Sequence, residues 1–259
     1  MPLKLPATVT TVEKRRLDQR DRPYGFADAL AYCLRGQGPL LLAGYVVFMV
    51  AAGAIGAVGG CLAQLALLVA VAFLTPGMLF EIVRQSAAGE TEPPDWPDFF
   101  DYGERFREIW RFVLVAAVSL VPTIVLLRLF GCDGMEFLRG ERGPGCWSAL
   151  VLGTALGVPI GVFAFGAAGL HRTAWLAFRL DLHLRAIASL PVEGLRTSGL
   201  LAALLLVSQL ADWLLRGIPL LGGTIEHAIS AYTLFTGAHL VGILFRRHAE
   251  TLERIYIAD

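Results

Sequence analysis

Six polar side chains interrupt the apolar stretches of this chain, and they are the first candidates for chemistry. Such groups are costly in hydrocarbon, so each needs a partner or a function. His239 lies in the middle of an apolar stretch, where it could relay protons or bind a ligand, or simply be a packing histidine with satisfied hydrogen bonds. Asp212 can pair with Arg216 four residues later. Glu226 and His227 open the last apolar stretch, where a helix N-terminus favours a carboxylate. The other two are Gln64 and Gln209.

The sequence contains none of the common catalytic patterns, such as a P-loop, a zinc-protease helix, a nucleophile elbow or an EF-hand. Haem ligation by two histidines needs them on facing helices, whereas His227 and His239 lie in one stretch. The four cysteines form no C-x-x-C pair and have no zinc-finger spacing. We therefore expect no catalytic residues, no cofactor and no metal.

The composition places the chain among membrane proteins. Hydrophobic residues make up 56% of it and charged residues only 17%, whereas soluble domains are about 45–50% apolar with glycine included. The 22 basic and 22 acidic residues cancel, so nothing indicates a nucleic-acid partner. The partner that composition does predict is the lipid bilayer.

The apolar stretches predict about six transmembrane helices. Residues 36–80 carry no charged side chain, and as one helix they would be roughly 68 Å long, about twice the ~30 Å core of a bilayer. We expect this stretch to fold back at Gly59-Gly60, making the first of three hairpins in an all-α bundle. The predicted spans are Pro39–Val58, Cys61–Val83, Ile109–Phe130, one within Gly143–Leu170, Thr197–Leu215 and His227–Phe245.

The basic residues predict the orientation of these spans. Eighteen Lys and Arg fall in the two terminal segments and in the loops after the second and fourth spans, and four fall on the other side. Positive charge stays on the cytoplasmic side, so both termini are expected in the cytoplasm. The predicted division is a basic tail at 1–23, a transmembrane domain at 24–250 and a C-terminal tail at 251–259. The basic tail could also attract anionic lipid.

Three segments on the predicted cytoplasmic side have amphipathic patterns, namely Tyr24–Leu34, Phe99–Ile109 and His171–Leu190. Each precedes a hairpin and could form a helix along the membrane surface. A unit of surface helix and hairpin repeated three times is one interpretation. The other is that juxtamembrane segments become amphipathic without any repetition.

A proline-rich acidic loop lies between the second and third spans. Its closely spaced prolines exclude a helix, and Asp98 could cap a helix that begins at Phe99. The loop is either a stiff connector or a docking epitope for a protein partner. The candidate docking residues are Pro93, Pro94, Asp95, Trp96, Pro97 and Asp98.

Glycines at four-residue spacing predict close contacts between helices. Gly56 and Gly60 form one such pair, and Gly153, Gly157 and Gly161 form a double run. Each set leaves one helix face without side chains, which lets a second backbone approach in lipid. The contact could be internal or with a partner subunit.

Two cysteines stand at the ends of the loop between the third and fourth spans. Cys132 and Cys146 are predicted to lie outside the cytoplasm, where thiols can be oxidised, and the glycines between them allow the ends to meet. A disulfide between them is therefore one hypothesis. Cys61 is a competing partner, Cys33 should remain a reduced thiol, and the alternative is that the cysteines are small apolar residues.

The chain resembles a family of bacterial and archaeal membrane proteins catalogued as domain of unknown function 4013. The resemblance implies a multi-pass architecture in the inner membrane of a prokaryote and no catalytic residues. The matches, over about residues 25–250, are Gly44-Tyr45, Pro94–Phe99 with Gly103, Ile218–Gly222 and Ala238–Gly242.

Three functional hypotheses follow. The first is a membrane scaffold or accessory subunit whose cytoplasmic surface engages a protein partner or a second copy. The second is a small transporter or channel with a polar site in mid-membrane, favoured by the prolines at 76, 122 and 159. A lipid-modifying enzyme comes third. A polar-lined cavity would favour transport, whereas a closed, glycine-packed bundle would favour the scaffold.

Overall fold

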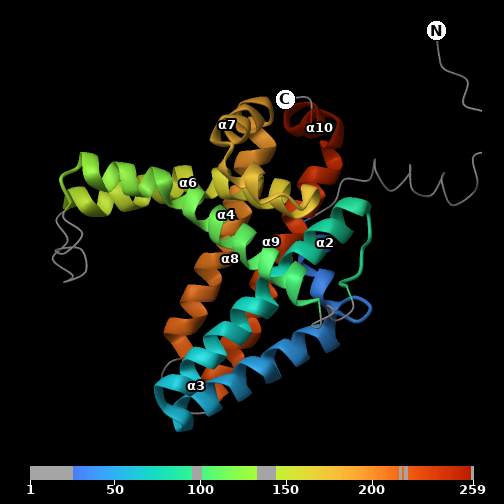
Figure 1. Cartoon of the computed structure of the whole chain (residues 1–259), viewed down its shortest axis with the longest axis vertical. Helices are drawn as coiled ribbons and strands as arrows, with labels where there is room; N and C mark the ends of the chain where they lie inside the picture. The colour runs from blue at the N-terminus through green and yellow to red at the C-terminus, as the bar shows by residue number, and fades with distance from the viewer. Residues whose placement is uncertain (1–25, 95–100, 133–143, 216–217, 219–220, 258–259) are drawn as a thin grey trace, which may run out of the picture.

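Every regular element in the described part of the chain is a helix. The computed structural model describes residues 26–94, 101–132, 144–215, 218 and 221–257. Within these residues, six helices are long and apolar enough to cross a membrane, which confirms the predicted number (Figure 1). The elements are α2 Phe26–Leu30, η1 Tyr32–Leu34, α3 Gly38–Ala88, α4 Tyr102–Leu129, α6 Pro144–His171, η2 Ala174–Phe178, α7 Leu180–Ser189, α8 Pro191–Leu215, α9 Leu221–Arg247 and α10 Ala249–Ile257.

The first hairpin is formed within α3, which breaks where the sequence predicts a reversal. Gly60 has non-helical backbone angles with φ +66°, a conformation open to glycine because it has no Cβ. The two spans on either side of the break are Gly38–Ile55 and Gly59–Ala88. Gly60 therefore turns the chain, and a Cβ built on it would meet nothing within 4 Å. Gly60 therefore makes no close helix contact with the described residues of this chain, and packing of Gly56 and Gly60 against a partner subunit stays a prediction.

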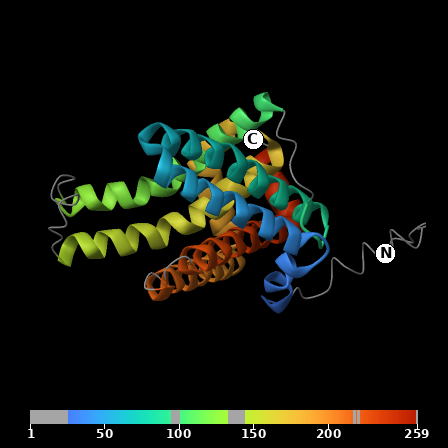
Figure 2. The same cartoon turned by 90° about the horizontal axis from the view of Figure 1, so that it is seen from below.

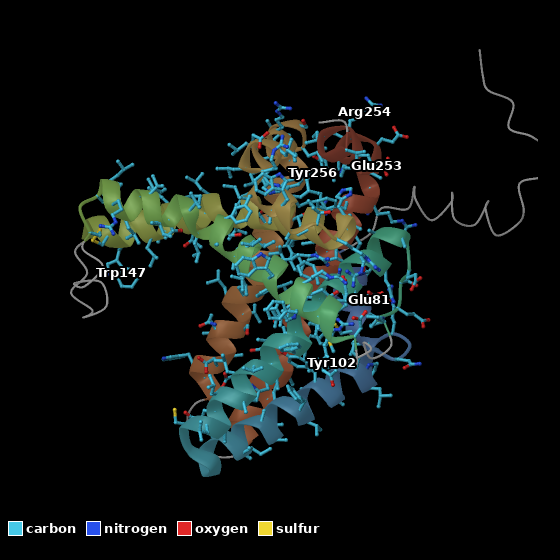
Figure 3. All side chains as sticks on the ribbon, in the orientation of Figure 1. Glu81, Tyr102, Trp147, Glu253, Arg254 and Tyr256 are labelled. Atoms are coloured by element: carbon cyan, nitrogen blue, oxygen red, sulfur yellow. A yellow bond between two sulfur atoms is a disulfide. The ribbon has the colours of Figure 1, made fainter. Side chains whose placement is uncertain are left out.

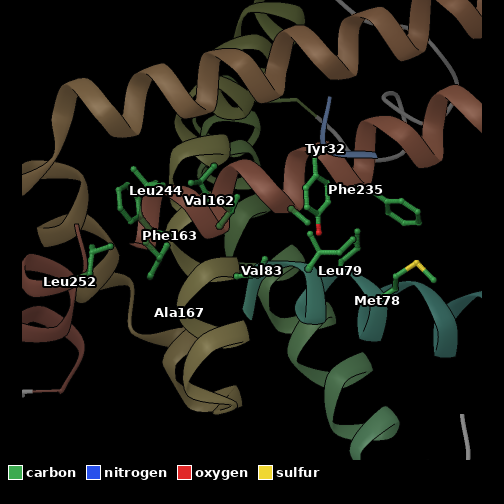
Figure 4. Packing of buried hydrophobic residues seen from close by; sticks show 14 of the residues in the cluster. Tyr32, Met78, Leu79, Val83, Val162, Phe163, Ala167, Phe235, Leu244 and Leu252 are labelled. Carbon is green, nitrogen blue, oxygen red and sulfur yellow. The ribbon is translucent and has the colours of Figure 1, made fainter. Parts of the chain in front are cut away.

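The three hairpins share a packed base and have diverging tips. The α4–α6 hairpin projects to one side (Figures 1 and 2), whereas the tips of α3 and of α8–α9 lie at the lower end of Figure 1. The largest core cluster lies where α3 and α9 pack, and Figure 4 shows Tyr32, Leu79, Val83 and Phe235 gathered there. The base, not the tips, holds the molecule together.

The predicted spans have the right centres, but several of them begin too late. The helix α4 begins at Tyr102 and runs without interruption into the span, so the amphipathic pattern of Phe99–Ile109 does not give a separate surface helix. Asp101 caps this helix by accepting a hydrogen bond from the amide of Glu104 at 3.1 Å. The expected cap, Asp98, lies outside the described residues.

The segment before α3 packs between helices of the bundle. Tyr32 and Cys33 are buried in the core that α3 and α9 form. The hydroxyl of Tyr232 in α9 donates a hydrogen bond to the carbonyl of Leu30. The Cys33 thiol lies 3.6 Å from the hydroxyl of Thr236. These polar contacts fix α2 and η1 against α9.

Three short helices form a cap over the base of the hairpins, and we call η2, α7 and α10 the end cap. The predicted C-terminal tail is largely helical, because Leu252 and Tyr256 bury one face of α10. Figure 1 shows α7 and α10 beside each other at the end opposite the α8–α9 tip. Amphipathic short helices are thus present, but they pack on the protein.

Candidate functional site

A buried carboxylate joins α3 to α4 at the base of the hairpins. Glu108 is 1% exposed, and its two oxygens accept hydrogen bonds from Arg84 at 3.0 Å and from Arg105 at 2.6 Å. Arg84 also binds Glu81 at 2.6 Å. A buried charge is stable only when it is paired and hydrogen-bonded, and Glu108 meets both conditions. This network holds the first and second hairpins together.

Gly77 makes room for that network. A Cβ on this residue would overlap the guanidinium of Arg105 and come within 2.8 Å of a Glu108 oxygen. The lack of a side chain in α3 therefore lets the charged groups of α4 approach its backbone. Gly77 therefore leaves the space that the ion pairs of Arg105 and Glu108 occupy. Its position next to Pro76 in the sequence did not indicate this role.

A second polar cluster surrounds His239. Its ring stacks on Tyr32 with centroids 3.7 Å apart, and its Nδ1 lies 2.6 Å from the hydroxyl oxygen of Ser86. Gly242, one turn later, brings α9 against the same part of α3, because a Cβ there would lie 2.5 Å from the Cβ of Ser86. The motif Ala238–Gly242 therefore brings α9 into close contact with α3 at Ser86.

The geometry at His239 fits a packing role. Ser86 and His239 are each 1% exposed, so a substrate cannot reach the pair in this conformation. A serine–histidine pair that acts as nucleophile and base must be open to its substrate. The contacts of His239 are therefore structural. Its hydrogen bond to Ser86 and its stack on Tyr32 fix η1 between α3 and α9.

The other polar residues predicted within the spans are not gathered around His239. Asp212 lies in the last turn of α8, and Glu226 and His227 lie in the first part of α9, all of them partly buried. His227 and His239 are on one helix and far apart along it. Among the described residues, no group of three or more potential metal ligands is present.

The glycine run in α6 packs against α4. Cβ atoms on Gly153 and Gly157 would overlap backbone atoms of Thr123 and Ser119, and one on Gly161 would lie 2.6 Å from the Ser119 hydroxyl oxygen. The contact is thus internal to the second hairpin. Gly56 lies in α3, where its surroundings are outside the described part of the structure.

The tip of the same hairpin carries a disulfide. The structure joins Cys132, just after α4, to Cys146 in the first turns of α6, with their Cα atoms 5.8 Å apart. Cys33 and Cys61 are free thiols, and Cys33 is buried. Burial raises the pKa of the Cys33 thiol to about 11, despite an opposing hydrogen bond from Thr236. Cys33 is therefore an inert thiol at neutral pH.

The proline-rich loop contributes only its first part to the described structure. Pro93 and Pro94 are buried, and Pro93 lies against the start of α3 near Gly38. These two residues stabilise an internal contact and are not available to a docked partner, so their inclusion in a docking epitope is wrong. Residues 95–98, the rest of the candidate epitope, lie outside the described residues.

The end cap presents an aromatic surface to the outside. Trp175 is 67% exposed and Phe178 is half-exposed, with ring centroids 6.2 Å apart. Leu184 of α7 is also half-exposed. Among polar side chains nearby, Arg179 binds Asp181 at 3.0 Å, which lowers the pKa of that carboxyl. The end cap therefore exposes both large apolar side chains and a charged pair.

A buried histidine holds the end cap together. The Nδ1 of His183 lies 3.0 Å from the hydroxyl of Tyr256, and its Nε2 lies 3.3 Å from the carbonyl oxygen of Ala177. These contacts link all three helices of the cap, and Figure 3 shows Tyr256 on the α10 side of it. Burial lowers the pKa of His183 and raises that of Tyr256, so both are neutral at pH 7.

The sequence did not predict the ion-pair network around Glu108 or the hydrogen bonds of His183 in the end cap. Arg84 and Glu81, and likewise Arg105 and Glu108, are three residues apart on their helices, which is the spacing of an intrahelical ion pair. That signal could have identified each pair. The contact between Arg84 and Glu108 and the one between His183 and Tyr256 leave no pattern in a single sequence.

Comparison with known proteins identifies a family. Neither the curated proteins nor the solved structures gave a match. The family model described as protein of unknown function (DUF4013) matches residues 60–245, from the turn of the first hairpin nearly to the end of α9. The match covers most of the chain, and the chain therefore belongs to the DUF4013 family.

Proposed function

We propose that this protein is a membrane scaffold or accessory subunit that engages a protein partner through the end cap. The observation that carries the proposal is the exposed aromatic pair, Trp175 and Phe178, on the end cap. Exposed tryptophan and phenylalanine contribute strongly to interfaces, because each buries a large apolar area when covered. If the end cap faced only water, exposing these two rings would bring no gain in stability.

Preorganisation of the cap supports this assignment. The inner side chains Leu182, His183 and Ala186 are at most 1% exposed, and His183 is hydrogen-bonded at both ring nitrogens. A partner that binds such a surface does not have to order the segment first, so less binding free energy is lost. The aromatic pair is thus presented on a rigid support.

The charge pattern supports a cytoplasmic position for the cap. Arg172, Arg179, Arg185 and Arg196 belong to the cap or flank it, and basic residues near spans are retained in the cytoplasm. With the C-terminus at the same end (Figure 1), we place both the cap and the C-terminus inside the cell, in the inner membrane of a prokaryote.

Transport has less support than scaffolding. The large cavity within the described residues is lined mainly by leucine, valine, phenylalanine and glycine, with a few hydroxyl groups and no charged side chain. A site for a polar solute or ion needs convergent polar groups at mid-membrane. His239 and Ser86 are both buried and bind each other.

Site-directed photo-crosslinking tests the proposal. A benzoyl-phenylalanine residue at Trp175, in the full chain in native membranes, should give one discrete protein adduct after irradiation, identified by mass spectrometry. The double variant Trp175→Ala/Phe178→Ala should lose the partner that co-purifies with the wild type. Trp213→Ala is the matched control, because Trp213 is 69% exposed but lies at the far end of α8.

Two results would contradict the proposal. One is an adduct with lipid alone at position 175, which would make the aromatic pair a membrane anchor. The other is equal loss of the co-purifying protein in the Trp213→Ala control, which would show that the aromatic surface of the cap is not the docking site.

A further inference from the structure

The first turns of α4 have aromatic rings on the outside and acidic side chains on the inside. Tyr102, Phe106 and Trp110 recur every four residues, so they lie on one face of the helix. They are 66%, 66% and 55% exposed, and we call these three residues the aromatic face of α4. Glu104 and Glu108 have the same spacing but are two residues out of phase, which is about 200° around a helix.

The acidic residues on the opposite side of α4 are paired within the bundle. Glu104 binds Arg111 at 3.0 Å, and both side chains are largely buried. Glu108 is held by Arg84 and Arg105. A helix on the surface of a soluble protein has the reverse arrangement, with its apolar side inside and its charges outside. These turns of α4 are therefore built for an outer side that does not face bulk water.

The aromatic face continues into the lipid-facing side of the span. The helix α4 is long and apolar enough to cross a membrane, and it runs without interruption from Tyr102 to Leu129. Val113 and Ile124 continue the same face and are about half-exposed. Lipid is the neighbour of that part of the helix, and no break separates it from the three rings.

The length of α4 fixes the depth of the aromatic face in the bilayer. A helix of 28 residues is about 42 Å long, which matches the ~40–45 Å of a bilayer with its headgroups. A core of about 20 residues, counted back from Arg128 near the other end, begins near Ile109. A helix tilt of about 20° moves this point by roughly one residue. Trp110 and Phe106 therefore lie on either side of the hydrocarbon boundary, and Tyr102 lies among the headgroups.

We propose that the aromatic face of α4 binds the phospholipid headgroup layer on the side of the hairpin bases. Tryptophan and tyrosine suit this layer because their rings have an apolar body and a polar group. The charge at the edge of the face also fits. Arg107 follows Phe106 and is 66% exposed while it pairs with Glu104 at 3.1 Å, and an exposed guanidinium at this depth can reach lipid phosphate.

The same argument does not extend to the aromatic pair of the end cap. The helix α6 ends at His171, and η2 begins at Ala174, so Trp175 and Phe178 are not on the continuation of a span. The proposal for α4 therefore does not depend on the partner proposed for the end cap. Headgroup contacts at the aromatic face would hold the ion-pair network around Glu108 at the boundary of the membrane.

Site-directed spin labelling of the full chain tests the proposal. In a Cys61→Ser background no exposed free thiol remains among the described residues, because Cys33 is buried and Cys132 is bridged to Cys146. A nitroxide is attached to one new cysteine at a time, and the protein is placed in vesicles of phosphatidylethanolamine and phosphatidylglycerol. The measurement is the ratio of nitroxide collisions with oxygen, which concentrates in lipid, to collisions with a water-soluble nickel chelate.

The collision ratio should fall stepwise along the aromatic face, from Trp110→Cys through Phe106→Cys to Tyr102→Cys. Val113→Cys gives the reference for lipid, and Glu253→Cys, at an exposed position on α10, gives the reference for water. The ratios at Trp110 and Phe106 should lie between these two references. The three label positions are independent, so a variant that does not elute as the wild type does on gel filtration leaves two others to decide.

Two results would overturn the proposal. Ratios at Trp110 and Phe106 equal to the one at Glu253 would show that the aromatic face is in contact with water. Low collision rates with both reagents would show that protein covers it, either a partner or a second copy of this chain. Neither result involves Trp175 or Phe178, so failure here is distinguishable from failure of the end cap as a docking surface.

Discussion

Glu108 shows how individual residues stabilise a membrane protein of this kind. Its carboxylate accepts hydrogen bonds from Arg84 and Arg105, and its neighbours include Gly77, which leaves space for the guanidinium of Arg105. Removing one partner from such a set leaves charge that is buried and uncompensated. The contribution of the network is therefore best tested by deleting the central carboxylate.

Replacing Glu108 with glutamine should destabilise the fold strongly. The amide keeps the shape of the side chain but removes the negative charge that compensates two arginines, at an expected cost of about 3–5 kcal/mol. The measurement is the temperature at which half of the detergent-extracted protein is lost from the monodisperse peak. Glu253→Gln, at an exposed position on α10, is the control. Equal temperatures for Glu108→Gln and the wild type would contradict a structural role for the network.

At this scale the sequence predicts little beyond which residues are unusual. His239 was identified because an imidazole in an apolar stretch is costly, but its contacts with Tyr32 and Ser86 join residues that are far apart in the chain. Such contacts follow from how helices pack, which no local spacing records. Tyr32, in turn, had no signal of its own, because tyrosine is common near membrane boundaries.

Helices were predicted more successfully than single contacts, because length and charge determine where a span can lie. The centres of all six spans agree with the structure. The beginning of α4 does not, because the charged residues before Ile109 remain helical when Arg111 and Glu104 pair at 3.0 Å across two turns. The positions of helix ends thus depend on side-chain contacts, whereas the positions of spans depend on the bilayer.

The pairing of α4 with α6 depends on one glycine face. Gly157→Leu should weaken it, because the new side chain would overlap the backbone carbonyl of Ser119, and overpacking of this kind costs about 1–3 kcal/mol. Gly199→Leu is the matched control in α8, where a Cβ would meet nothing within 4 Å. The same measurement of thermal loss in detergent should show a lower temperature for Gly157→Leu alone. A shift of the same size in both variants would remove the packing role assigned to Gly157.

In the whole molecule, the polar contacts that fix the hairpins to one another gather at the base. The ion pairs around Glu108, the ring stack at His239 and the hydrogen bonds of His183 in the end cap all lie near the base. The disulfide between Cys132 and Cys146 closes one tip. This division matches the separation of Lys and Arg along the chain. The direction in which the hairpins diverge has no counterpart in the hydropathy pattern, because that pattern records burial in lipid and not the angle between spans.

We propose that all three hairpin bases, with both termini, lie in the cytoplasm and that all three tips lie outside it. A reporter that functions only in the cytoplasm, fused in turn after Asp259 and within the 133–143 segment at Gly140, tests this directly. The account predicts signal from the fusion at Asp259 and none from the fusion at Gly140. Signal at Gly140 with none at Asp259 would contradict the orientation of the chain, and signal from both would contradict the six-span arrangement.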